Sequence, residues 1–282
     1  MNSEIRLKSK FLLSGNTLRL FFITLVSALL RYGTLGVGLF GALAIHKSEF
    51  FKNLLFTYND TAVYTAFVFS SVIIFAAILI FSAAVRGGEN FIFFTRAQNS
   101  KGHFRLLFKY LHPEKAFAFF RLYLKINGLK LFWLIYFLLP FLFCSACSYY
   151  LYASSHLSET VYLILCAGAS LLLAISIVMW RFANLRYSAA PYYLCLNTKR
   201  GVNYVINKSI RFTDGFLSEG VILEYSTLGW ISSCIFIIPA FYVVPYLKLT
   251  KAVFISHVVF CNTEASKTTY PINFLKSGEH IN

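Results

Sequence analysis

The feature that most constrains the fold is an uninterrupted apolar stretch at residues 62–85, AVYTAFVFSSVIIFAAILIFSAAV. These 24 residues include no charged residue, no glycine and no proline. As an α-helix, with a rise of ~1.5 Å per residue, the stretch is about 36 Å long, which covers the ~30 Å hydrocarbon core of a bilayer with some tilt. A helix also satisfies its backbone hydrogen bonds within one segment, as lipid requires. The stretch therefore predicts a transmembrane helix in an integral membrane protein.

The composition agrees with this prediction. The chain is 58% hydrophobic and only 13% charged, whereas a soluble domain has about 25% charged residues. The net charge of +15 would suggest nucleic acid as the partner of a soluble protein, but the sequence has no nucleic-acid-binding motif. We therefore expect the Lys and Arg residues to lie in cytoplasmic loops and to contact anionic lipid headgroups, with no nucleic acid as a partner.

Four other apolar stretches have the length of a membrane span. The predicted spans are residues 20–45, 62–85, 131–155, 160–180 and 217–247. The first is too long for the apolar region of a cleaved signal peptide, which favours an uncleaved span. Pro140 predicts a kink in the third span, and Pro239 and Pro245 interrupt the fifth. The tail at residues 262–282 is polar. We predict one membrane domain over residues 1–282, an all-α polytopic transmembrane helix bundle with five spans, or six if the chain turns at Pro239.

Two basic segments, residues 103–126 and 201–212, are predicted to contain amphipathic helices. In the first, apolar residues recur at helical spacing at Phe104, Leu107, Phe108 and Leu111. Basic amphipathic helices of this kind lie in the membrane interface; packing on the cytoplasmic domain of a partner is the alternative. The side chains expected to contact lipid headgroups are Arg105, Lys109, Lys115, Lys125, Lys208 and Arg211.

The distribution of positive charge predicts an orientation. Lys and Arg number four in the N-terminal arm, nine in residues 86–130 and six in residues 181–211, against two in residues 46–61 and none in residues 156–159. The positive-inside rule then places the N-terminus and both large basic segments in the cytoplasm, at the cell membrane. Five spans would leave the C-terminal lysines outside, against the rule, whereas six would return them to the cytoplasm.

Residues 186–246 contain an ordered set of landmarks. Tyr187 precedes Ser188-Ala189-Ala190-Pro191-Tyr192, and further landmarks follow in order at Ser209, Gly215, Ser226, Gly229, Trp230, Pro245 and Tyr246. In order and spacing this region resembles the C-terminal half of a bacterial multi-pass membrane family, domain of unknown function 975. The resemblance implies a membrane architecture and a bacterial source, but no reaction.

A charged residue within a span is the sharpest candidate for function. Arg31 lies in the first predicted span, and burying an Arg in lipid costs at least ~2.5 kcal/mol. It could face a transport or binding cavity, snorkel to the interface, or pair with an acid. If the fifth helix begins near Phe216, Glu224 lies at a similar depth, so we predict that Arg31 and Glu224 form an interior pair.

Other catalytic signals are weak. The six His residues are dispersed without metal-ligand spacing, and no nucleotide-binding motif is present, so we expect no metal, cofactor or catalytic site. Cys144-Ser145-Ala146-Cys147 is a CxxC sequence, which suggests a thiol redox protein as a remote alternative, but Cys packs commonly in apolar helices. We predict a non-enzymatic structural or accessory protein of the cell envelope that binds membrane lipids and a membrane protein partner. The alternative is a transporter or channel for a small or lipidic solute.

Overall fold

The computed structural model describes residues 1–47, 60–100, 102–154, 158–198, 200–233 and 237–265, and the predicted polar tail lies mostly outside them. The regular elements in these residues are all helical. In chain order they are α1 (Asn2–Leu13), α2 (Thr17–Ala28), the π-helical turn η1 (Leu29–Gly33), α3 (Thr34–Lys47), α5 (Asp60–Ala97), the 3₁₀ helix η2 (Phe104–Phe108), α6 (Pro113–Ala153), α7 (Glu159–Leu185), α8 (Ala190–Leu196), α9 (Val202–Thr213), α10 (Leu217–Tyr225), α11 (Leu228–Ser233) and α12 (Ile237–Ala265).

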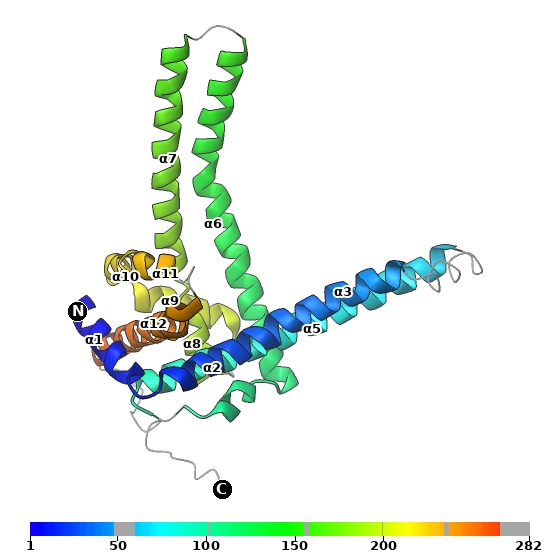
Figure 1. Ribbon diagram of the computed structural model, residues 1–282, viewed down its shortest axis with the longest axis vertical. Helices are drawn as coiled ribbons and strands as arrows, with labels where there is room; N and C mark the ends of the chain where they lie inside the picture. Colours follow the sequence, from blue (N-terminus) through cyan, green and yellow to red (C-terminus); the bar gives the residue numbers. More distant parts are fainter. Residues whose placement is uncertain (48–59, 101, 155–157, 199, 234–236, 266–282) are drawn as a thin grey trace.

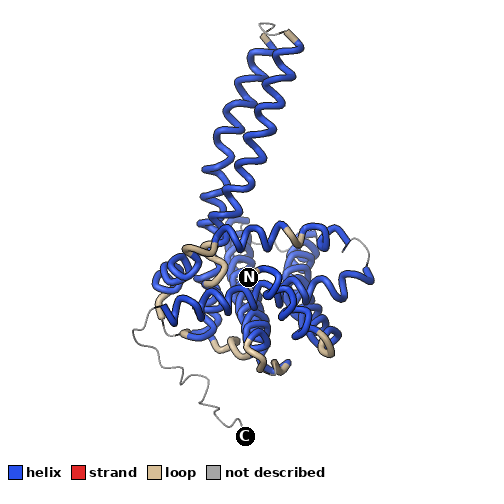
Figure 2. The backbone as a smooth tube through the Cα atoms, turned by 90° about the vertical axis from the view of Figure 1, so that its left-hand side faces the viewer, coloured by secondary structure: helices blue, strands red, loops and turns tan. Residues whose placement is uncertain are grey.

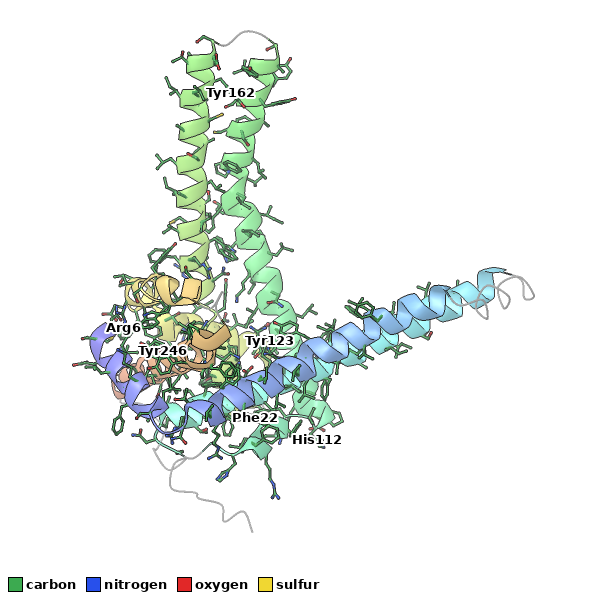
Figure 3. The ribbon with its side chains drawn as sticks, viewed as in Figure 1. Arg6, Phe22, His112, Tyr123, Tyr162 and Tyr246 are labelled. Carbon is green, nitrogen blue, oxygen red and sulfur yellow. The ribbon has the colours of Figure 1, made fainter. Side chains whose placement is uncertain are left out.

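Two helix hairpins project from a common helical body. One hairpin is formed by α3 and the neighbouring part of α5, and the other by α6 and α7 (Figure 1). The view turned by 90° shows the α6–α7 hairpin standing clear of the body along most of its length (Figure 2). Side chains stand out on both helices of this hairpin, with Tyr162 near its tip and Tyr123 where α6 meets the body (Figure 3).

Among the described residues, four helical stretches are long and apolar enough to cross a membrane: Thr17–Gly41, Val68–Ala97, Pro113–Ala153 and Glu159–Leu196. Each contains or overlaps one of the first four predicted spans. Little of the span-length apolar window in each stretch is buried within the protein, which leaves most of its apolar side chains on the outside. The chain is thus an all-helical protein whose helices are compatible with a membrane.

The fifth predicted span, residues 217–247, is not a single helix. α10 ends at Tyr225, where Thr227 Oγ1 donates a hydrogen bond of 2.7 Å to the carbonyl oxygen of Glu224, and α11 then begins at Leu228. α12 continues through Pro245 and buries Leu249, Val253 and other apolar residues in the body. A helix that is apolar around its circumference can be a core helix as well as a span. The hydropathy of this region comes in part from a helix of the protein core.

The predicted interfacial helix at residues 103–126 is also divided differently. Residues Phe104–Phe108 form only a short 3₁₀ helix, whereas Pro113 begins α6, a position where proline is favoured because its missing N–H has no helical partner. α6 is 41 residues long, about 60 Å at the rise of an α-helix and about twice the thickness of the hydrocarbon core. Its first turns are buried in the body through Phe119 and Leu122, and its remainder forms the hairpin.

The body is built around α5 and α12. Its main core joins apolar residues of α1, α2, α5 and α12, including Leu13, Ile23, Phe93 and Leu249, and a second core joins α6, α8 and α9. The backbone of η2 packs directly on α5 at Gly88, where a Cβ atom would lie 2.1 Å from the carbonyl oxygen of Leu107. Glycine is required there because of this close approach.

Candidate functional site

A buried carboxylate connects three parts of the body. Glu89 lies in α5 and is only 3% exposed. Its Oε2 atom lies 3.2 Å from Nη2 of Arg31 in η1 and accepts a hydrogen bond of 3.0 Å from the hydroxyl of Ser27 in α2. Its Oε1 atom accepts a hydrogen bond from the ammonium of Lys248 in α12. Buried carboxylates are stable only when paired and hydrogen-bonded, and this one meets both conditions. We call Ser27, Arg31, Glu89 and Lys248 the Glu89 cluster.

The π-helical turn presents Arg31 to this carboxylate. Arg31 Nε donates a hydrogen bond of 3.1 Å to the carbonyl oxygen of Ser27, and Thr34 Oγ1 donates to the carbonyl oxygens of Leu30 and Arg31. These side chains donate hydrogen bonds to backbone carbonyl oxygens in and next to the π-helical turn, where the helix is wider than an α-helix. Ser27 and Arg31 therefore approach Glu89 from one helix face. π-turns are rare and occur often at functional sites.

Further charge lies beside the cluster. Asn90 Nδ2 donates a hydrogen bond of 2.9 Å to the hydroxyl of Tyr123, and the guanidinium of Arg86 lies 4.7 Å from the centre of the Tyr123 ring. Burial lowers the pKa of Lys248, and the opposing attraction of Glu89 partly offsets this effect. Arg31 and Lys248 thus give one carboxylate an excess of positive charge, and Arg86 lies nearby over the Tyr123 ring.

The predicted pair of Arg31 with Glu224 is wrong. The structure places Arg31 against Glu89, whereas Glu224 lies 3.9 Å from Lys251. The predicted second span ends at Val85, and the next predicted helix begins only in the basic segment at residues 103–126. Instead α5 continues to Ala97 and brings Glu89 into the core. Residues 92–94, Ile-Phe-Phe, continue the apolar pattern without a proline, and that signal would have indicated a longer helix.

The landmarks in residues 186–246 mainly shape the body. The Tyr187 hydroxyl accepts a hydrogen bond of 2.9 Å from Trp133 Nε1, and Ser209 donates one of 2.7 Å to the carbonyl oxygen of Arg186. Gly215 has a φ of +88°, a backbone conformation that favours glycine. Tyr246 is buried in the main core. Of the other landmarks, Ser226 caps the C-terminal end of α10, Gly229 and Trp230 lie in α11, and Pro245 lies in α12.

Some of the residues predicted to contact lipid instead contact other side chains of the protein. α9 is a helix over the predicted range, but its apolar face, with Val205 and Ile206, packs on the second core rather than on lipid. Lys125 hydrogen-bonds the Asn203 side chain, and the Lys109 ammonium lies 4.0 Å from the centre of the Phe91 ring. Lys208 lies over the Phe212 ring. Lys208 is partly buried, and the other five members of the set, Arg105, Lys109, Lys115, Lys125 and Arg211, are exposed.

Two sequence predictions concern a metal site and the CxxC cysteines. Within the part of the chain that the structure describes, no group of three His, Cys, Asp or Glu residues could hold a metal ion. Cys144 and Cys147 are both free thiols on the α6–α7 hairpin.

A family model described as "Protein of unknown function (DUF975)" matches residues 1–260. The chain belongs to the DUF975 family. The resemblance seen over residues 186–246 is therefore confirmed and extends over the N-terminal half, and the matched region includes every residue of the Glu89 cluster. Comparisons with curated proteins and with solved structures found no match. The function of this DUF975 protein must be argued from its own geometry.

Proposed function

We propose that this protein is a non-enzymatic structural or accessory component of a bacterial cell membrane, with its N-terminus in the cytoplasm. The observation that carries the proposal is the closed geometry of the Glu89 cluster. Charges along a transport pathway face a water-filled cavity. Here the Glu89 carboxylate is 3% exposed and contacts Arg31, Lys248 and Ser27 from two neighbouring segments. The cluster acts as a fixed connection between helices.

The projecting hairpins support an interaction role. On the α6–α7 hairpin, Phe143 is 72% exposed and Leu171 is 63% exposed. Large apolar faces of this kind need lipid or a partner helix to cover them. A hairpin that stands clear of its own body offers both of its faces to such neighbours (Figure 2).

A transporter or channel for a small solute is the second candidate. The π-turn at Arg31 and the excess of positive charge around Glu89 favour it, because both are found at ion and substrate sites. Gly38 of α3 packs closely on α5, where a Cβ atom would lie 2.6 Å from Ile78 Cδ1, so this glycine is explained by helix packing.

Site-specific photocrosslinking in native membranes tests the first proposal. A photoreactive residue is placed at Phe143 or Leu171, and at the fully buried Phe119 as the matched control. The structural role predicts a discrete protein adduct at the two exposed sites, absent at Phe119, with the same protein copurifying in constant ratio. Lipid adducts alone, together with a solute flux in proteoliposomes that Glu89→Gln abolishes, would establish transport instead.

A further inference from the structure

A cavity of about 400 Å³ lies between α7, α10 and α12, lined by residues outside the Glu89 cluster. Much of its wall is apolar, with Ile177 and Leu185 from α7, Leu223 from α10, and Leu247 and Phe254 from α12. This volume lies within the usual range for small-molecule sites. Walls of this composition suit the hydrocarbon portion of an amphipathic ligand.

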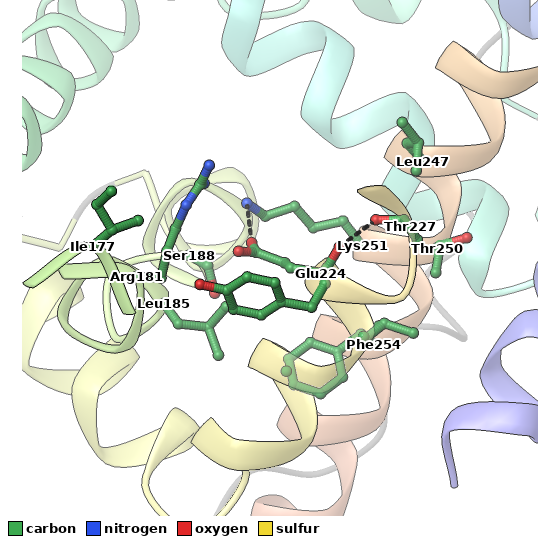
Figure 4. A pocket seen from close by; sticks show the side chains of 13 residues that line it. Ile177, Arg181, Leu185, Ser188, Glu224, Thr227, Leu247, Thr250, Lys251 and Phe254 are labelled. Atoms are coloured by element: carbon green, nitrogen blue, oxygen red, sulfur yellow. Dashed lines mark hydrogen bonds and ion pairs between the residues drawn. The ribbon is translucent and has the colours of Figure 1, made fainter. Parts of the chain in front are cut away.

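Charged groups gather at one side of this cavity. Figure 4 shows the cationic ends of Arg181 and Lys251 on the same side, with Leu185 and Phe254 on the opposite side. Lys251 Nζ lies 3.9 Å from Oε1 of Glu224, which is too long for a hydrogen bond. The lining thus places two cations beside one carboxylate.

The positive charge around Lys251 exceeds what Glu224 offsets. The packed surroundings lower the pKa of Lys251 by desolvation, Glu224 opposes this effect, and the charges of Arg86 and Arg181 lower the pKa further. Even so, 48% of the side chain remains accessible, so that a ligand can reach the ammonium. An anion at this position would relieve the repulsion between these cations.

A polar atom in the wall also lacks a partner. The hydroxyl oxygen of Ser188 is buried, lines the cavity, and has no hydrogen-bond partner among the described residues. Buried hydroxyl groups normally have one. A phosphate oxygen would accept the hydrogen bond that this hydroxyl can donate.

We propose that this cavity binds an anionic phospholipid, with Arg181 and Lys251 holding the phosphate and the apolar wall holding part of an acyl chain. Arg181 lies near the end of α7, after the apolar sequence of a candidate span. Basic pockets between helices at the cytoplasmic side of a membrane bind anionic headgroups, and a guanidinium matches the geometry of phosphate oxygens. The inference goes beyond the proposed structural role and holds equally for a transporter.

Native mass spectrometry of the purified full-length protein tests the headgroup. Phosphatidylglycerol and phosphatidylcholine are titrated separately into the detergent-solubilised protein. The proposal predicts that the anionic lipid binds about tenfold more tightly, the equivalent of ~1.4 kcal/mol. Equal binding of the two lipids by the unmodified protein would overturn the proposal without reference to any variant.

Substitutions then locate the site. Arg181→Gln and Lys251→Gln should each weaken phosphatidylglycerol binding by about fivefold, the equivalent of ~1 kcal/mol for each charge. Glu224→Gln should strengthen phosphatidylglycerol binding, because the substitution removes a carboxylate that competes with the phosphate. A misfolded protein could not bind the lipid more tightly. The exposed residues Arg200 and Lys10 provide matched controls as Arg200→Gln and Lys10→Gln, which should bind as the unmodified protein does. Equal losses in the controls and in the site variants would contradict the assignment.

A last pair of measurements separates a lipid from a free phosphate. Ile177→Trp fills the apolar part of the cavity from a partly exposed position. It should weaken binding of the lipid about tenfold, ~1.4 kcal/mol, and millimolar inorganic phosphate should not displace the lipid. Unchanged lipid binding by Ile177→Trp, or full displacement by inorganic phosphate, would exclude a phospholipid as the ligand.

Discussion

Arg31 Nη2 lies 3.2 Å from Glu89 Oε2, and the same carboxylate also contacts Lys248 in α12. The contact fixes α5 against the junction of α2 and α3, and Lys248 adds α12 to the same connection. Because two cations share this carboxylate, removing the carboxylate should cost more folding free energy than removing either cation alone. This asymmetry distinguishes the Glu89 cluster from a simple ion pair.

Glu89→Leu should therefore destabilise the protein more than Arg31→Leu does. It leaves both Arg31 and Lys248 without their partner, and breaking a buried pair in this way costs about 3–5 kcal/mol. The cost of Arg31→Leu should be smaller, because Lys248 and Ser27 still contact the carboxylate. Reversible unfolding in mixed micelles, followed by tryptophan fluorescence, measures both free energies of unfolding.

The double variant of Arg31 and Glu89 should show a coupling of at least ~1 kcal/mol. The matched control is the double variant of Arg31 and Glu224, whose effects should add to within about 0.5 kcal/mol because the two residues have different partners. If the effects of the Arg31 and Glu89 variants were additive and those of the Arg31 and Glu224 variants were coupled, the pair predicted from the sequence would be correct instead.

Gly88→Ala should destabilise the protein. Its Cβ atom would lie 2.1 Å from the carbonyl oxygen of Leu107, and a backbone atom cannot move aside as a flexible side chain can. We expect a loss of about 1–3 kcal/mol or more in the free energy of unfolding. A Cβ atom at Gly168 in α7 would meet open space, so Gly168→Ala should be neutral or stabilising by about 0.5–1 kcal/mol. Similar losses in both variants would contradict the packing of η2 on α5.

Tyr187→Phe tests one of the landmarks that the sequence singled out. The substitution removes the acceptor of the Trp133 Nε1 hydrogen bond and leaves a partly buried donor unsatisfied. The expected loss is about 1–3 kcal/mol. Tyr136→Phe removes the hydroxyl of an exposed residue on the same helix as Trp133 and serves as the control, with an effect within about 0.5 kcal/mol of zero. If the two variants unfold alike, the hydrogen bond contributes nothing to stability.

Some of this structure is accessible from sequence alone because hydropathy and helical periodicity are local. The 24-residue apolar stretch at residues 62–85 lies within α5, and the amphipathic helix predicted in residues 201–212 is α9, with Val205 and Ile206 buried on one face. Periodicity identifies a face but does not say what covers it, and here protein covers the face that the sequence predicts to contact lipid.

The partner of Arg31 cannot be predicted from the sequence in the same way, because its identity depends on where α5 ends. The glycines at 87 and 88 suggest a break in a helix, but in the fold they permit the close approach of Phe119 and of the Leu107 backbone. Likewise, the sequence at residues 217–247 predicts a span, and only the three-dimensional packing around Leu249 identifies α12 as a helix of the core. These features depend on tertiary contacts that no short window of sequence contains.

The division of the fifth predicted span changes the expected topology. If the four candidate spans cross the membrane and α10, α11 and α12 do not, we expect the end of α12 on the same side as the N-terminus. This arrangement resolves the conflict of five spans with the positive-inside rule, because Lys248 and Lys251 then lie on the cytoplasmic side. Paired alkaline phosphatase and green fluorescent protein fusions after Ser158, Asn197 and Ala265 measure the side of each position. Phosphatase should be active only after Ser158, and fluorescence should appear only after Asn197 and Ala265. Phosphatase activity after Ala265 with fluorescence after Asn197 would mean that the chain crosses the membrane between these two positions and that α12 is a span after all.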